Sequence, residues 1–125
     1  MSKRVFISFA IEDERARDFL VGQAKNDKSP FEFMDMSVKE PWSSEWKIKC
    51  RTKIKGCDTV IALISKKTKG ADGAKWEMKC ANEEGIPMLG VHIYKDDKGE
   101  VPSELSGYKV IEWSWPGIDT FINSL

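Results

Sequence analysis

Glu77 is the residue whose type and position most strongly indicate chemistry. When the segment 74–83 is drawn as a helix, at about 100° per residue, its apolar side chains form one arc, and Glu77 falls inside that arc. A carboxylate among apolar side chains must be paired, neutral or directed into a cleft. A single carboxylate without a metal or base partner suits a substrate with a good leaving group and a cationic transition state. Cleavage of an N-glycosidic bond is such a reaction.

A structural role for Glu77 is the competing interpretation. In that case the carboxylate pairs with a lysine such as Lys66 or Lys67 and seals the helix. If Glu77 instead does chemistry, we expect it to point into an open notch where a substrate could bind. The residue pattern by itself leaves both interpretations open.

The elements that must position Glu77 alternate between strands and helices. Strands are predicted at 5–9, 31–34, 59–65, 88–94 and 109–113, and helices over 12–24, over a segment capped by Ser43 or Ser44 and ended by Gly56, around Glu77 up to Gly85, and at the C-terminus. The segment Thr59–Ser65 is apolar throughout, as in a strand buried on both faces of a parallel sheet. We therefore predict one α/β domain over residues 1–125, with a flavodoxin-like three-layer fold and a five-stranded parallel sheet in the order 2-1-3-4-5.

This topology predicts where a ligand binds. In open parallel sheets, ligands bind at the carboxyl ends of the strands where the strand order reverses, here between the first and third strands. Those ends carry Phe9 and Ser65, and the helix after the third strand brings Glu77 to the same crevice. Trp42, in the loop after the second strand, is predicted to staple the next helix, with a role as a substrate lid as the alternative.

Composition and missing motifs exclude several functions. Twenty basic and twenty acidic residues give a net charge of zero, which argues against nucleic acid as a partner. No apolar run approaches the ~20 residues of a membrane span, so we expect a cytoplasmic protein without a membrane partner. Three cysteines without a C-x-x-C pair, and one histidine, argue against a metal site. The chain has neither a dinucleotide-binding glycine motif nor a P-loop, and Ser65 stands where a phospho-receiver needs aspartate.

Three segments together resemble the TIR-like domain family, and within it the stand-alone bacterial proteins of the Thoeris anti-phage system. The opening strand Val5–Phe9, followed by two acidic residues, resembles the first TIR box. The run Ile54–Ser65 is similar to the third-strand signature of that subfamily. The third segment joins Trp76-Glu77-Met78 and Ala81 to Gly85–Val91, and the resemblance as a whole spans residues 3–94.

The resemblance implies a catalytic activity on NAD, which is a substrate here and not a cofactor. By this resemblance Glu77 is the catalytic glutamate, and Ser8, Phe9, Asp35 and Ser65 lie near the substrate. Trp76 is expected either to stack on the nicotinamide ring or to pack in the core. The implied product is a cyclic ADP-ribose-type messenger that reaches a partner effector protein, and self-association of the chain is left open.

The competing functional class is a non-catalytic TIR-like module that only binds other proteins. Nucleoside or nucleotide 2-deoxyribosyl transfer would also use one glutamate, but the companion acidic and aromatic motifs of those enzymes are not evident. Many TIR-like relatives carry a serine and an aromatic residue one turn before the glutamate, where this chain has Asp72-Gly73-Ala74.

Overall fold

The structure is a computed structural model that describes residues 3–125, and its centre is a parallel sheet of five strands. These are β1 (Arg4–Ser8), β2 (Glu32–Met34), β3 (Thr59–Ile64), β4 (Met88–His92) and β5 (Lys109–Glu112). Their order is β2-β1-β3-β4-β5, and every neighbouring pair is parallel. The predicted flavodoxin-like fold and its strand order are therefore confirmed.

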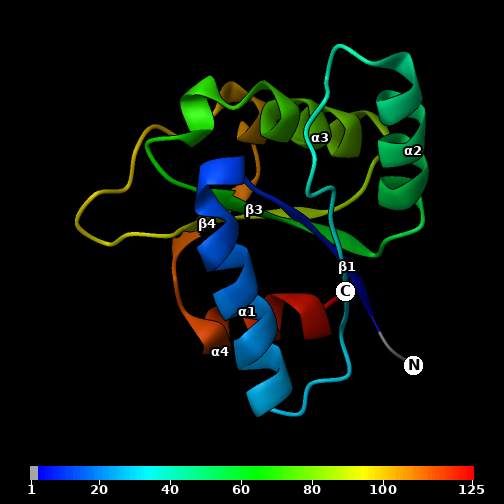
Figure 1. Ribbon diagram of the computed structural model, residues 1–125. Coiled ribbons are helices and arrows are strands. Elements are labelled where there is room, and N and C mark those ends of the chain that lie inside the picture. The colour runs from blue at the N-terminus through cyan, green and yellow to red at the C-terminus, as the bar shows by residue number, and fades with distance from the viewer. Residues whose placement is uncertain (1–2) are drawn as a thin grey trace.

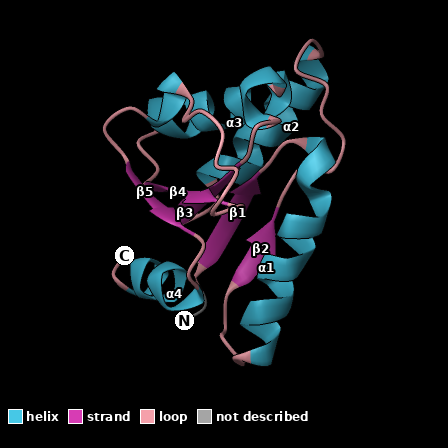
Figure 2. Ribbon diagram, turned by 90° about the vertical axis from the view of Figure 1, so that its left-hand side faces the viewer, coloured by secondary structure: helices cyan, strands magenta, loops and turns pink. Residues whose placement is uncertain are grey.

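Helices cover both faces of this sheet, as Figures 1 and 2 show. One face carries α2 (Ser44–Lys55) and α3 (Asp72–Glu83), and the other carries α1 (Glu14–Asn26) and α4 (Trp115–Asn123). Short 3-10 turns at Ile11–Asp13, Thr68–Gly70 and Ser103–Leu105 complete the chain. Among the described residues, none of the helices has the length and apolar character needed to cross a bilayer.

The alternation of side chains along each strand divides the core into two clusters. In β3, Val60, Ala62 and Ile64 face the α2–α3 side, whereas Ile61 and Leu63 face the α1–α4 side. All six residues of β3 are buried, which explains the continuous apolar run in the sequence. The edge strand β2 is only half buried, in line with its alternating pattern.

The loop from β2 to α2, residues 35–43, has no regular structure and lies next to the carboxyl end of β1. Figure 1 shows it in cyan, running from the end of β2 past β1 and α3 to the start of α2. Ser43 ends the loop as the N-cap of α2, because its hydroxyl accepts a hydrogen bond from the backbone N–H of Trp46. This loop contributes one wall of the site described below.

Candidate functional site

The Glu77 carboxylate is fully buried at the carboxyl end of β1, on the α2–α3 side of the sheet. Ser8, the last residue of β1, donates a hydrogen bond from Oγ to Glu77 Oε1 at 2.9 Å, and its Oγ also lies 3.1 Å from the Ala74 carbonyl. Cys50 of α2 places its Sγ 4.0 Å from Oε2. Burial raises the pKa of the Cys50 thiol, so this group is a protonated donor toward the carboxylate.

Lys39 of the 35–43 loop completes the surroundings of Glu77. Its Nζ lies 2.8 Å from Oε2 and 3.1 Å from Oε1. The lysine side chain is itself only 10% exposed, while that of Glu77 is completely buried. The same ammonium lies 4.3 Å from the centre of the Phe9 ring, which adds a cation–π contact.

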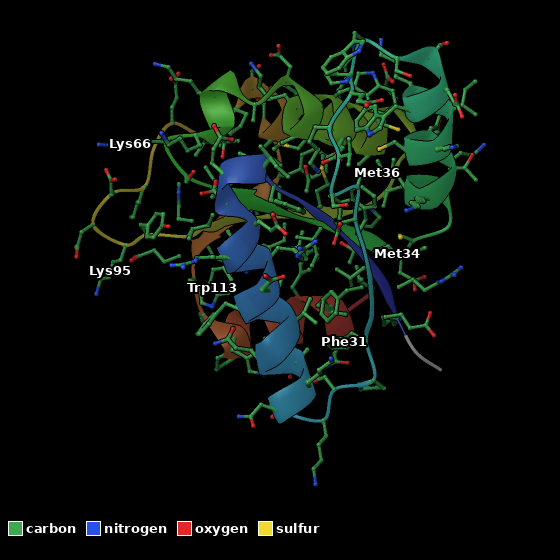
Figure 3. All side chains as sticks on the ribbon, viewed as in Figure 1. Phe31, Met34, Met36, Lys66, Lys95 and Trp113 are labelled. Carbon is green, nitrogen blue, oxygen red and sulfur yellow. The ribbon has the colours of Figure 1, made fainter. Side chains whose placement is uncertain are left out.

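These contacts answer the two questions that the sequence left about Glu77. The carboxylate is paired with a lysine, but the lysine is Lys39 and not Lys66 or Lys67. Lys66 pairs with Asp97, and Figure 3 shows it on the opposite side of the molecule from Met36 of the 35–43 loop. The prediction of an open notch is wrong for this conformation, because Lys39 covers the carboxylate.

Burial shifts the pKa of Glu77 toward neutral pH. Complete burial raises the pKa of Glu77 from its ordinary value of 4.5 to about 7, although the Lys39 ammonium and the Ser8 hydrogen bond both oppose the rise. The negative charge of Asp35 adds a smaller upward contribution. A carboxyl group with a pKa near neutrality, held by a serine and a lysine, is typical of functional sites, although structural ion pairs can produce the same effect.

A hollow of about 230 Å³ lies beside this carboxylate at the point where the strand order reverses. Its walls come from the segment after β1, the segment after β3 and the 35–43 loop, and Lys39 is one of the lining residues. This is the place that the topology predicts for a ligand. Lys39 therefore separates the buried carboxylate from the hollow.

Trp42 lies at the rim of the same hollow. Its side chain is 78% exposed, so the predicted staple against α2 is wrong: a staple requires the indole to be packed against the helix. An exposed indole beside a hollow is free to contact a ligand, which is the alternative that the sequence left open.

Phe9, Asp35 and Ser65 each contact a charged side chain. Phe9 is buried beneath Lys39 and also contacts the guanidinium of Arg17 at 5.2 Å. Asp35 accepts a hydrogen bond from the same Arg17 at 2.9 Å. Ser65 donates from Oγ to Asp13 at 2.5 Å, which ties the end of β3 to the turn after β1.

Trp76 lies outside this group, although it precedes Glu77 in the sequence. Its ring packs against Trp46 of α2, with centroids 5.4 Å apart, and the Arg51 guanidinium lies 5.5 Å from the centre of its ring. The structure thus places Trp76 at the α2–α3 interface. Successive helical residues differ by about 100°, so the neighbour of a buried residue faces elsewhere.

Sequence reasoning missed Lys39 entirely. It lies in a loop without periodicity, and no local pattern distinguishes it among the twenty Lys and Arg residues of the chain. Cys50 lies four residues after Trp46, a spacing that indicates the apolar face of a helix and gives no sign of a contact with Glu77. Among residues 3–125, no three His, Cys, Asp or Glu side chains gather in a way that could hold a metal ion.

Comparison with known proteins gives one family match. Residues 6–98, more than half of the 125-residue chain, match a family model described as "Thoeris protein ThsB, TIR-like domain". No curated protein matched the chain.

Solved structures are also similar to this chain, at low sequence identity. A prokaryotic SEFIR domain is 17% identical, with a TM-score of 0.54, and the match covers 98% of this chain and 89% of that one. A 3-dehydroquinate dehydratase-like protein from Bifidobacterium longum is 13% identical, with a TM-score of 0.49, covering 99% and 94%. At such identity, the likeness to the SEFIR domain supports the fold alone.

Proposed function

This chain belongs to the TIR-like domain family of the Thoeris protein ThsB, and on that premise we propose that it cleaves NAD at the nicotinamide N-glycosidic bond. One observation carries the proposal: a single carboxylate, Glu77, is held by Ser8 at the carboxyl end of β1, beside the hollow where the strand order reverses. The family assignment also makes the chain a TIR-like defence protein.

In the proposed reaction, the bond between the nicotinamide nitrogen and ribose C1′ breaks. Nicotinamide leaves with the bonding electrons, and positive charge develops on C1′ and the ring oxygen. The ionised Glu77 carboxylate stabilises that charge, and its position is fixed in advance by the Ser8 hydrogen bond. Since Lys39 covers Glu77 here, substrate must displace the lysine side chain before the carboxylate can act.

Either of two nucleophiles can then complete the reaction. Attack by water, with loss of one proton, gives ADP-ribose. Attack by the adenine–ribose half of the same molecule, again with loss of one proton, gives a cyclic ADP-ribose isomer. We propose the cyclic product, acting as a messenger for a partner effector protein, as the outcome that fits a Thoeris-type protein.

The test is incubation of the protein with NAD, followed by mass analysis of the products. The proposal predicts free nicotinamide together with a second product. The linear and cyclic forms of that product differ in mass by one water, so the same measurement separates hydrolysis from cyclisation. NAD that remains intact, in cells that carry the defence system and have been challenged with phage as well as in vitro, would contradict the proposal.

The alternative is a TIR-like module that binds proteins without catalysis. The observation in its favour is the closed Lys39–Glu77 pair, which a structural role explains equally well. Under this alternative, a Glu77→Gln variant protects cells as well as the unaltered protein does. Under the enzymatic proposal the same variant loses protection.

A further inference from the structure

We propose that the Lys39 ammonium occupies the position that the cationic ring of the substrate takes when it is bound. The site then binds a planar cation only when this lysine leaves. The inference deepens the proposed function and rests on it for the identity of the substrate. It adds a residue that decides when the site is accessible and which charge it accepts.

The first support is the chemistry of the place that the ammonium occupies. Lys39 Nζ lies within 3.1 Å of both Glu77 oxygens and 4.3 Å from the centre of the Phe9 ring. A carboxylate and an aromatic face both attract cations. A positively charged ring such as a pyridinium satisfies both groups in the same way, whereas a neutral ring leaves the carboxylate unpaired.

The second support is the close contact between the Lys39 side chain and Gly73 of α3, which we call the lysine seat. A Cβ added at Gly73 would lie 2.7 Å from Lys39 Cβ and 3.2 Å from its Cγ. Real Cβ atoms essentially never approach this closely, so only glycine lets the lysine stem lie against the first turn of the helix. The closed position of Lys39 thus depends on a residue far away in the sequence.

The third support is the way the loop is anchored. Residues before Lys39 are fixed, because the Val38 carbonyl accepts a 2.7 Å hydrogen bond from the Trp46 indole and Asp35 binds Arg17. After it, the chain passes through exposed Trp42 to the cap of α2. The loop is thus held on both sides of Lys39, so that the lysine side chain can leave the carboxylate while the loop backbone stays in place.

The test uses binding without bond cleavage. The probe is the 1-methylnicotinamide cation, which is methylated on the ring nitrogen, and neutral nicotinamide is the reference. The affinity of each is measured by calorimetry or NMR titration. The variant is Lys39→Ala, and Lys49→Ala is the control because it removes a lysine–glutamate pair on the surface of α2. Loss of Lys39 removes a group that lowers the pKa of Glu77, so the titrations are run at pH 8.5 to favour the ionised carboxylate in the variant.

We expect Lys39→Ala to bind the cation roughly tenfold more tightly or better, because the closed state no longer competes. Neutral nicotinamide should gain little, and Lys49→Ala should behave like the unaltered protein. Equal affinity for the cation in Lys39→Ala and the unaltered protein would overturn the inference. Equal gains for the cation and the neutral ring would also overturn it.

A second variant keeps the charge and removes only the lysine seat. Gly73→Ala should also tighten cation binding, whereas Gly22→Ala, at a helix position with nothing within 4 Å, should not. If Lys39→Ala does not fold, the result for Gly73→Ala decides. A gain in cation binding without NAD cleavage would reject the proposed function alone, and NAD cleavage without that gain would reject this inference alone.

Discussion

At the scale of single residues, the account depends on how burial changes the acidity of Glu77. The carboxylate is completely buried, and its pKa is raised to about 7 from the ordinary 4.5. In the unfolded chain it loses its proton near the ordinary value. The folded protein thus holds a proton that the unfolded chain has lost between those two pH values, and stability falls as pH rises through this window.

Glu77→Gln should remove this dependence. The difference between the two pKa values corresponds to about 3 kcal/mol. From pH 4.5 to pH 8 the free energy of unfolding of the unaltered protein should therefore fall by about that much, relative to that of the variant. Urea denaturation at several pH values measures it. A variant that is instead destabilised by ~3–5 kcal/mol at neutral pH would show that the ion pair with Lys39 is chiefly structural.

Ser8 should also affect the pKa of the Glu77 carboxyl group. Its hydrogen bond lowers the pKa of Glu77, so Ser8→Ala should raise that pKa further. If ionised Glu77 is needed for NAD cleavage, the rate rises with pH through the pKa, and its midpoint should move to higher pH in the variant. A pH–rate profile measures the shift, and an unchanged midpoint would contradict a positioning role for Ser8. We also expect a stability loss of about 1 kcal/mol.

At the scale of elements, α2 brings Cys50 toward Glu77, and its start is set by one serine. The sequence left Ser43 and Ser44 as alternative caps, and the structure assigns the role to Ser43, which accepts from the Trp46 backbone N–H at 3.2 Å. The difference arises from backbone conformation, since Ser43 is extended and Ser44 is already helical. A pattern of residue types does not locate the start of a helix to a single residue.

The matched pair of serines gives a direct test of this cap. Ser43→Ala should lower the free energy of unfolding by about 1 kcal/mol, because a backbone donor loses its partner. Ser44→Ala should be nearly neutral, as it is in the first turn without that role. Thermal melts of both variants measure the difference. Equal losses for the two would show that the cap is not the source of stability at this end of α2.

At the scale of the whole molecule, the layers are packed closely around the central strands. Gly90 of β4 shows this, since an added Cβ would lie 3.0 Å from Val110, 3.1 Å from Ile64 and 3.2 Å from Leu105. We expect Gly90→Ala to cost about 1–3 kcal/mol through overpacking. Urea unfolding should show a lower midpoint with an unchanged slope. An unchanged midpoint would mean that the core at β4 has more room than these distances indicate.

The sequence predicted the fold because fold-level signals are local and repeated. The apolar run in β3 and Gly56 at the end of α2 each indicated an element that the structure confirms. Chain topology then followed from general rules for parallel sheets. The position of Glu77 within an apolar arc indicated a carboxylate that must be paired, neutral or directed into a cleft, and the structure shows it buried and paired with Lys39.

The side chains that surround Glu77 were harder to predict from the sequence. The partner of Glu77 is set by the path of an irregular loop across α3, and that path depends on the fit between Lys39 and Gly73. Neither residue carries a local signal, because loops lack periodicity and a close approach across 34 positions is a tertiary property. The exposure of Trp42 was mispredicted for the same reason.

The central claim is that the Glu77 carboxylate cleaves NAD, and nicotinamide release by Glu77→Gln tests it most directly. Glu83→Gln is the control, since it alters a partly exposed glutamate of the same helix that pairs with Arg51. We predict a loss of roughly a hundredfold or more for Glu77→Gln, with both variants folded and Glu83→Gln close to the unaltered protein. Undiminished nicotinamide release by folded Glu77→Gln would contradict the account.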